Sequence, residues 1–497
     1  MADFKSLLKD TAVYGLSSIV GRFLNYLLVP LYTYKIAAES GGYGIITNLY
    51  AYTALLLVLL TYGMETAFFR FANKEGEDAK MVFSTALRSL LMSSVAFATL
   101  AAVFIKPLSE AMGYGDCPSY VLAMAVTVAI DAFQCILFAY LRYKGKAIKF
   151  AALKLTFIAA SIFLNLCAFV FLPEFYGRNP QLWGHVYDPS VGVGYVFYIN
   201  LFCTAAITLL FAGEIRGIGY GFDGALLRRM LSYSWPILLL GIAGILNQTI
   251  DKILFPGLYK GDDASVQLGI YGAASKIAMI MAMITQAFRY AYEPFVFGSS
   301  QEEDRAATYA RGMKYFLIFT LLAYITVVGY MDLLKHIINS DYWTGLRVVP
   351  IVMAAEIMMG IYFNLSFWYK LTDKTLWGAI FSGAGCAVLI AVNVLLVPRY
   401  GYMACAWGGV AGYGTAMLLS YFVGQKYYPV DYPLRDMLMY VAAAAALCIA
   451  MTFTGRLPLA ASLCINTLLI ASYGVMIIKR DLPALPALIA KRIRRNG

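Results

Sequence analysis

The chain has 497 residues, of which 61% are hydrophobic and only 13% are charged, and its mean hydropathy is +0.70. Soluble domains carry about 25% charged residues, so this composition excludes a soluble globular protein and indicates an integral membrane protein. The formal net charge of +11 would suit a nucleic-acid-binding protein, but the positions of the basic residues favour a different explanation.

Apolar runs of about 20 residues predict membrane-spanning helices rather than the short alternating strands of a membrane barrel. We therefore predict an all-α integral membrane protein. Fourteen such runs follow one another along the chain, at 11–33, 43–69, 84–105, 119–141, 152–172, 193–212, 234–258, 267–290, 314–331, 346–368, 377–397, 403–424, 437–454 and 459–478.

The basic residues cluster at alternate ends of these runs. The segments on one side hold 28 of the 39 Lys and Arg residues, the opposite loops hold eight, and Arg22, Lys252 and Lys276 lie within spans. By the positive-inside rule the basic side is cytoplasmic, and an even number of spans places both termini there. Most of the net charge is thus a topology signal, and the basic tail 479–497 is expected to contact anionic head groups.

An internal repeat relates spans one to six to spans seven to twelve, at an offset of 226 or 228 residues. Arg22 and Asn25 correspond to Gln248 and Asp251, and Asn48 corresponds to Lys276. Because six spans are an even number, both copies insert the same way up, which predicts two lobes related by a pseudo-two-fold axis along the membrane normal. The expected divisions are an N-lobe at 1–212, a linker at 213–233, a C-lobe at 234–424, a helix pair at 425–478 and the tail.

Charged residues inside the spans are the first candidates for a functional site. A Lys, Arg or Asp at the centre of a membrane helix costs about 2.5–3.5 kcal/mol on insertion scales, and this cost is met by a cavity or by a partner. For Asp251 and Lys276 an ion pair between neighbouring helices is the alternative to a cavity. Arg22 has no acid on its own helix, which favours a position facing a cavity.

Acidic residues predict two further sites. Buried carboxylates are candidates for ion coupling, or else are neutral acids hydrogen-bonded within a lobe; they are Asp131, Asp251 and Glu356. Charged residues near the basic ends of spans two and eight are candidates for an inner gate between the lobes, or else extend to water; they are Glu65, Arg70 and Glu293.

Motifs of catalysis and of cofactor binding are lacking in the sequence. His185 and His336 are two separate loop histidines, which make no metal site, and the eight cysteines form no CxxC pair. The sequence contains no GxxxxGK[ST], no G-x-S-x-G and no H-E-x-x-H. We therefore expect a transporter rather than an enzyme, without a bound cofactor or metal.

Three segments carry a resemblance to a known family. The segments GRFLNYLLVPLYTYKI, GGYGIITNLY and LLTYGMETAFFRF resemble the amino-terminal part of Wzx-like oligosaccharide flippases, polysaccharide-synthesis members of the MOP superfamily and relatives of the MATE exporters. The resemblance implies a central cavity between two lobes, lined by spans one, two, seven and eight. It implies a cargo of undecaprenyl-diphosphate-linked oligosaccharide, moved to the periplasmic leaflet by alternating access that is coupled to a proton or sodium gradient.

The cavity side chains fit such a cargo. Arg and Lys form charge-assisted hydrogen bonds with a diphosphate, and amide side chains suit sugar hydroxyls. The expected substrate-binding residues are Arg22, Asn25, Asn48, Gln248, Lys252, Lys276 and Arg289. The expected location is the inner membrane of a bacterium, and the expected partners are the lipid-linked oligosaccharide, membrane lipids and other polysaccharide-assembly proteins. We expect a monomer that binds no nucleic acid.

Three other functions stay open at this point. A MATE-type exporter of cationic drugs would need a cavity dominated by carboxylates, whereas the set here includes Arg22, Lys252 and Lys276. A membrane polysaccharide polymerase or ligase would need catalytic groups on large outer loops, and the outer loops are short. A flippase of the peptidoglycan precursor belongs to the same superfamily, and the sequence separates it poorly from the oligosaccharide flippases.

Overall fold

The structure is a computed structural model, and it describes residues 24, 26–216, 221–298, 302–372 and 374–481. Helices make up almost all of these residues, and no strand occurs among them, which confirms the predicted all-α class. A helix satisfies its own backbone hydrogen bonds, which a membrane interior requires. Arg22 and Asn25 lie outside the described residues, and so does the side chain of Glu293.

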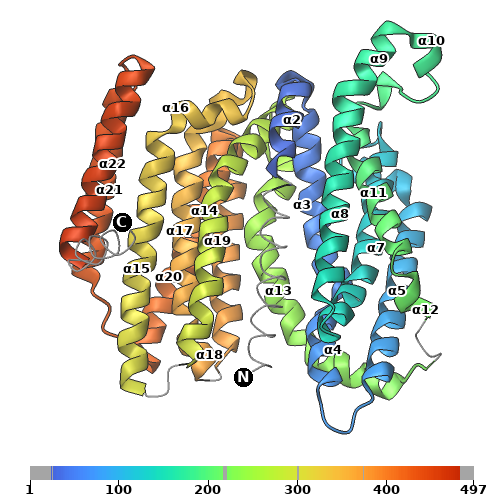
Figure 1. Ribbon diagram of the computed structural model, residues 1–497, viewed down its shortest axis with the longest axis horizontal. Helices are drawn as coiled ribbons and strands as arrows, with labels where there is room; N and C mark the ends of the chain where they lie inside the picture. Colours follow the sequence, from blue (N-terminus) through green and yellow to red (C-terminus); the bar gives the residue numbers. More distant parts are fainter. Residues whose placement is uncertain (1–23, 25, 217–220, 299–301, 373, 482–497) are drawn as a thin grey trace, which may run out of the picture. The chain divides into compact units, whose positions relative to one another are not determined.

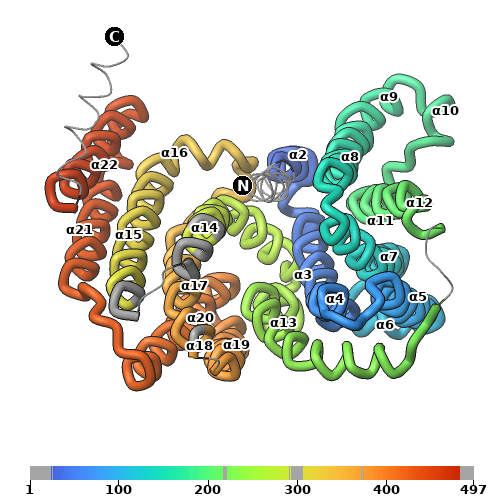
Figure 2. The backbone as a smooth tube through the Cα atoms, turned by 60° about the horizontal axis from the view of Figure 1, so that its bottom comes forward, coloured from blue at the N-terminus to red at the C-terminus, as the bar shows by residue number. Residues whose placement is uncertain are grey.

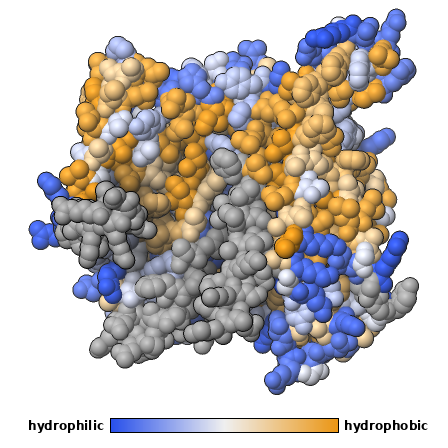
Figure 3. All heavy atoms as spheres, in the orientation of Figure 1, coloured by the Kyte–Doolittle hydropathy of each residue, from blue (hydrophilic) through white to orange (hydrophobic). Residues whose placement is uncertain are grey.

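Eleven helices in the described part of the chain are long and apolar enough to cross a membrane. A twelfth apolar helix, α11 (Gly194–Leu209), is shorter. The predicted first span lies largely outside the described residues, so the total of fourteen stays a prediction. On the face shown in Figure 3, hydrophobic residues cover much of the long helices and hydrophilic residues gather at the helix ends.

The helices cluster into two compact units, of which the first comprises residues 1–273 and 389–405. Its described helices are α2 (Leu28–Lys35), η1 (Ala38–Ser40), α3 (Gly42–Thr61), α4 (Met64–Ala72), α5 (Ala79–Val103), α6 (Ile105–Ala111), α7 (Pro118–Tyr143), α8 (Ala147–Leu166), η2 (Cys167–Phe171), α9 (Leu172–Arg178), α10 (Pro180–Trp183), η3 (Pro189–Val191), α11, α12 (Ala212–Arg216), α13 (Gly224–Leu258), the start of α14 (Ala264–Gly298), the end of α19 (Leu376–Tyr400) and the start of α20 (Tyr402–Tyr427).

The second unit comprises residues 274–388 and 406–497. Its described helices are the remaining parts of α14, α19 and α20, with α15 (Glu302–Gly329), α16 (Met331–Leu334), η4 (Lys335–Ile337), η5 (Ser340–Val348), α17 (Val349–Leu365), α18 (Phe367–Leu371), α21 (Leu434–Thr454) and α22 (Leu459–Asp481). The units follow helix packing, whereas the two predicted lobes follow the sequence repeat and stay a prediction.

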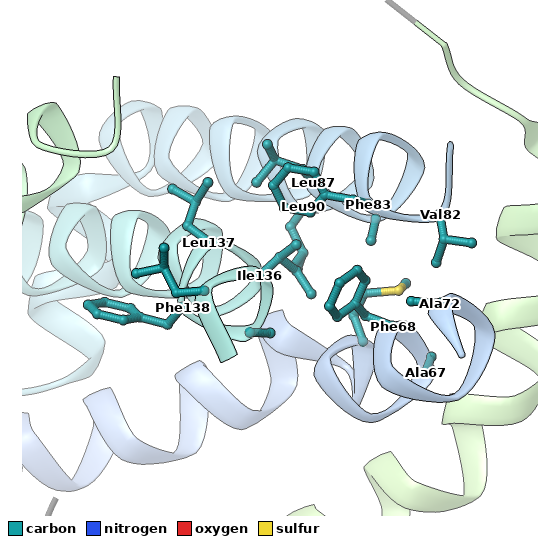
Figure 4. Close-up of a cluster of buried hydrophobic side chains, with 14 of the residues drawn as sticks. Ala67, Phe68, Ala72, Val82, Phe83, Leu87, Leu90, Ile136, Leu137 and Phe138 are labelled. Atoms are coloured by element: carbon teal, nitrogen blue, oxygen red, sulfur yellow. The ribbon is translucent and has the colours of Figure 1, made fainter. Parts of the chain in front are cut away.

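A hydrophobic cluster near the basic ends of the helices holds the first unit together. Phe68 on α4, Phe83 on α5 and Ile136 on α7 are almost completely buried and pack against one another's helices (Figure 4). The ring of Phe83 also stacks on Tyr140 at a centroid distance of 3.9 Å. Burying an aromatic side chain of this size stabilises a fold by about 1.5–3 kcal/mol in aqueous reference systems, so this cluster fixes α4 against α5 and α7.

Helix α13 is continuous over 35 residues and begins at Gly224, within the predicted linker 213–233. The carboxylate of Asp223 caps it by accepting hydrogen bonds from the amides of Ala225 and Leu226. Arg229 then pairs with Glu77 at 2.5 Å. Figures 1 and 2 show the helix running beside α3 and α4.

Two lysines hold the short helix α12 against the start of α8. Lys149 donates to both carboxylate oxygens of Glu214 at 2.8 and 2.7 Å, and Lys146 lies 3.5 Å from the same group. Desolvation by burial acts to raise the pKa of Glu214, but the hydrogen bond and charge of Lys149 outweigh it and leave that pKa below its ordinary value. This contact is therefore stronger when Glu214 is ionised.

A Glu214→Gln variant is expected to unfold at a lower temperature than the wild type at neutral pH. The unfolded glutamate titrates at its ordinary pKa, so the contact stabilises the fold above that pKa and is lost as the pH falls through the lower pKa of the folded state. Thermal unfolding in detergent at neutral pH and below about pH 4 measures the difference between the two proteins. A difference that stays constant down to the acidic condition would contradict the predicted electrostatic origin.

The second unit carries a charge cluster near the basic end of α15. The ammonium of Lys314 pairs with Asp436, at 2.9 Å, and with Asp481. Asp436 also pairs with Arg480, and the hydroxyl of Tyr440 donates to Asp481. Because these residues come from α15, α21 and α22, the cluster attaches the last two helices to α15. Next to it, α15, α17, α20 and α21 border an open groove of about 800 Å³ with an almost entirely apolar lining.

Candidate functional site

Helices α3 and α14 cross closely at the ends opposite to their basic ends. A Cβ atom at Gly269 would lie 2.9 Å from the backbone nitrogen of Gly44, and a Cβ at Gly44 would overlap the carbonyl of Ser265. A Cβ at Gly272 would likewise overlap the side chain of Thr47. We call this contact, made by Gly44, Thr47, Ser265, Gly269 and Gly272, the glycine crossing. Only glycine lets two helix backbones approach so closely.

A hydrogen-bonded amide reinforces the glycine crossing. Asn48, one turn along α3 from Gly44, is 1% exposed. Its Nδ2 donates to the carbonyl oxygen of Lys252 on α13 at 2.7 Å, and its Oδ1 accepts from the hydroxyl of Tyr114 at 2.8 Å. Asn48 therefore connects α13 to α3 and to the loop before α7. The first copy of the repeat is thus bound directly to the second.

The second copy contributes a compact charge pair beside this amide. Lys252 Nζ lies 3.0 Å from both carboxylate oxygens of Asp251, and it also donates to the carbonyl oxygen of Gln248. Tyr271 donates its hydroxyl to Asp251 at 2.7 Å. Asp251 therefore pairs with its neighbour Lys252, and the ion pair with Lys276 that the sequence left open stays a prediction. The Lys252 side chain is 22% exposed, so the pair is not fully enclosed.

The remaining predicted residues lie in other places. Arg289 is on α14 in the second unit, with its guanidinium 5.0 Å from the centre of the Phe363 ring. Lys276 and Glu356 also lie in that unit, on α14 and α17. Of the predicted gate residues, Glu65 forms an ion pair with Arg142, whereas Arg70 lies 4.0 Å from the Tyr233 ring centre. The inner gate and the role of Arg22 stay predictions.

The second predicted span is two helices rather than one. Helix α3 ends at Thr61 and α4 begins at Met64, with Tyr62 and Gly63 between them at φ angles of 36° and 70°. A tyrosine in this left-handed region is strained, and such strain is concentrated at functional sites. The break places Glu65 in the first turn of α4. A tyrosine–glycine pair signals a turn only weakly, so the sequence predicted one span here.

Four charged residues form a group that extends from this break into the span, and the sequence did not bring them together. Glu65 pairs with Arg142 on α7 at 3.0 Å. Two turns back along α7, Cys135 Sγ lies 3.5 Å from the same carboxylate. The ammonium of Lys154 on α8 interacts electrostatically with both Glu65 and Asp131 and lies 4.0 Å from the centre of the Phe138 ring. We call Glu65, Asp131, Arg142 and Lys154, which come from α4, α7 and α8, the charge ladder.

The described part of the chain is thus an all-helical bundle of membrane-length helices, with charged side chains inside spans and one span broken at Tyr62 and Gly63. Among the solved structures that share this fold are three membrane proteins. They are the lipid II flippase MurJ in an inward closed conformation (TM-score 0.69, 14% identity, 95% of this chain and 99% of that one), an inward-facing multidrug resistance MATE family transporter of the MOP superfamily (0.61, 15%, 84% and 97%), and the MATE multidrug transporter DinF-BH (0.58, 17%, 84% and 95%).

The sequence itself identifies the family. Residues 7–291, more than half of the chain, match the model of the family described as "Polysaccharide biosynthesis protein", and the chain belongs to that family. This agrees with the resemblance found in its amino-terminal segments. None of the curated proteins compared by sequence matches the chain. The protein is thus a multi-pass membrane protein with a MOP-type transporter fold.

Proposed function

We propose that this protein is a flippase that moves a lipid-linked oligosaccharide across the inner membrane of a bacterium by alternating access. The observation that carries the proposal is the glycine crossing, where the two copies of the repeat meet in backbone contact at one end. Under the predicted topology that end is periplasmic. A carrier whose two halves close at the periplasmic end exposes its substrate site to the cytoplasm, where lipid-linked sugars are assembled.

The cargo in this proposal is an undecaprenyl-diphosphate-linked repeat unit of a surface polysaccharide. Its head group is strongly anionic, and Arg presents donors in a geometry that matches phosphate oxygens. We assign the main diphosphate contact to Arg22, with Lys276 as the second contact, whereas Lys252 pairs with Asp251 in the structure. Family membership supports a polysaccharide pathway, and the cationic set favours this cargo over a cationic drug.

We also propose that a gradient of protons or sodium ions drives the cycle. The candidate coupling residues are Asp131, Asp251 and Glu356. Asp251 is bound by Lys252 and Tyr271 beside the glycine crossing, so a change in its charge would alter the contacts where the two copies of the repeat meet. Asp131 belongs to the charge ladder, whereas Glu356 lies on α17 in the second unit.

The test is transport in proteoliposomes loaded with a fluorescent undecaprenyl-diphosphate oligosaccharide, with a membrane-impermeant quencher added outside. Arg22→Ala is expected to reduce the flipping rate by about 10–150-fold, because a hydrogen bond to a charged group is worth about 1.5–3 kcal/mol. Arg22→Lys should retain part of the rate, and the exposed Arg178→Ala serves as the control.

Three outcomes would overturn the proposed function. Flipping at the wild-type rate in Arg22→Ala would remove the assigned diphosphate contact. Efflux of organic cations that Arg22→Ala leaves unchanged would point to a drug exporter, and glycan transfer or polymerisation by the purified protein would point to an enzyme. In cells, deletion of the gene should stop surface polysaccharide synthesis, whereas a block in cell-wall synthesis would indicate a peptidoglycan-precursor flippase.

A further inference from the structure

The charge ladder connects the middle of the membrane with the break in the second span. Asp131, Cys135, Phe138 and Arg142 recur every three or four residues on α7, so they share one face of that helix. Asp131 lies 11 residues from Arg142, which is about 16 Å along a helix. At the Arg142 end stands Glu65, in the first turn of α4 directly after Tyr62 and Gly63.

Lys154 is positioned to serve either acid of the ladder. Its ammonium interacts with both Asp131 and Glu65, yet it is within ion-pair distance of neither and lies over the Phe138 ring instead. Glu65 has Arg142 as its partner in this structure. Asp131 is half-buried, and Lys154 is exposed at the surface of the helix bundle. Because Lys154 can pair with either acid, we call it the mobile cation.

The surroundings of Asp131 favour a proton over a metal ion as its ligand. The titratable groups in electrostatic or direct contact with Asp131 and Lys154 are Tyr50 on α3, Glu65 on α4 and Cys135 on α7, and Arg142 neutralises Glu65. Two acids and two bases leave no net negative charge to hold sodium. Among the described residues, no group of three or more His, Cys, Asp and Glu side chains is arranged to hold a metal ion.

We propose that Asp131 takes up one proton per cycle and that Lys154 transmits this event to the break at Tyr62 and Gly63. Without the proton, Lys154 neutralises the Asp131 carboxylate. A proton from the aqueous phase converts that carboxylate to a neutral acid, and Lys154 then moves to Glu65 and displaces Arg142. The ion pair that attaches the first turn of α4 to α7 is thereby replaced by one with Lys154 on α8. The same proton later leaves Asp131 for water. This mechanism rests on the proposed function, for which it supplies the coupling ion.

The proposal predicts opposite effects of two substitutions on the α3–α4 junction. Asp131→Asn imitates the protonated acid and frees Lys154 at every pH, whereas Lys154→Met removes the mobile cation and leaves Glu65 with Arg142. Glu65→Gln removes the shared acceptor and should also abolish the response. A matched control pair is Asp332 and Lys335, which form an ion pair 2.7 Å apart that is not part of the ladder.

The experiment measures backbone amide hydrogen exchange of residues 58–70 in lipid nanodiscs without substrate lipid, at acidic and neutral pH and corrected for the intrinsic exchange rate. In the wild type, exchange at the junction is expected to be faster at acidic pH by roughly 5–150-fold, the usual range of a coupling between two sites. Asp131→Asn should exchange fast and Lys154→Met slowly at both pH values. Asp332→Asn and Lys335→Met should retain the wild-type response.

Several results would overturn the inference: the same behaviour in Asp131→Asn and Lys154→Met, a retained pH response in both, or a change in exchange when sodium replaces potassium at constant pH. If one variant does not fold, the other two ladder variants still decide the matter. A wild type that shows the predicted exchange but flips no oligosaccharide would leave the inference standing and remove the proposed function. Flipping of oligosaccharide without the predicted exchange pattern would leave the proposed function standing and remove the inference.

Discussion

A Gly44→Ala variant is expected to lose most of its transport activity while still inserting into the membrane. The added methyl group would overlap the carbonyl of Ser265, which is backbone and cannot rotate away. Overpacking of this kind costs about 1–3 kcal/mol, and here the cost falls on the state in which α3 and α14 are in contact. A penalty of about 3 kcal/mol shifts a two-state equilibrium by about 150-fold.

The measurement for this prediction is the flipping rate together with the accessibility of the two crossing helices. A cysteine introduced at Ser265 should react faster with a membrane-impermeant maleimide in Gly44→Ala than in the unsubstituted protein, because the crossing is open for more of the time. Gly244→Ala is the matched control, since a Cβ there meets no atom within 4 Å. Normal transport and unchanged labelling in Gly44→Ala would show that the glycine crossing need not close.

The sequence predicted the regions that meet near the glycine crossing better than the individual contacts between them. The repeat matched Asn48 with Lys276 and Asn25 with Asp251, and the structure joins Asn48 to the backbone of Lys252, the neighbour of Asp251. Matching polar residues in two copies signal a shared location because each is costly in a membrane. The close approach of Gly44 and Gly269 has no such signal, because glycine is common in membrane helices and the spacing does not say which helix lies opposite.

The charge ladder could not be predicted from the sequence for a related reason. Lys154 stands near the end of a basic segment, so counting charges assigns it to the membrane surface. Its importance comes from α8 packing beside α7, which places its ammonium near Asp131 and Glu65. The partner of Glu65 is Arg142 on another helix, whereas the sequence made Glu65 a candidate for the inner gate or for a side chain that extends to water. Periodicity predicts the face of a helix, but the neighbour of that face depends on tertiary packing.

The second large effect is expected at the pair of Asp251 and Lys252. An Asp251→Ala variant should be strongly destabilised, because removing one partner of a buried ion pair costs about 3–5 kcal/mol. Asp251 has only 8% of its side chain exposed, and its loss would leave the Lys252 ammonium and the Tyr271 hydroxyl without their shared acceptor. The midpoint of thermal unfolding, followed by size-exclusion chromatography in detergent, measures the loss.

A double variant separates the structural from the transport role of this pair. Asp251→Asn combined with Lys252→Met removes both charges and keeps a polar partner for Tyr271, so its thermal midpoint should return close to that of the wild type. Replacing a buried ion pair by neutral groups of similar size is often nearly neutral for stability. The control is the surface pair, Asp332→Asn with Lys335→Met, whose interaction should contribute no more than about 1 kcal/mol.

Transport by the double variant then decides what the pair is for. If Lys252 leaves Asp251 to meet the cargo, or if Asp251 carries the coupling ion, a stable protein without either charge should flip at a small fraction of the wild-type rate. If the pair only holds α13 to α14, the stable double variant should flip normally. We expect the first result, because Asn48 and the glycine crossing already join α13 and α14 to α3 without any charge, and a charged pair is a costly way to make a contact that neutral groups make as well.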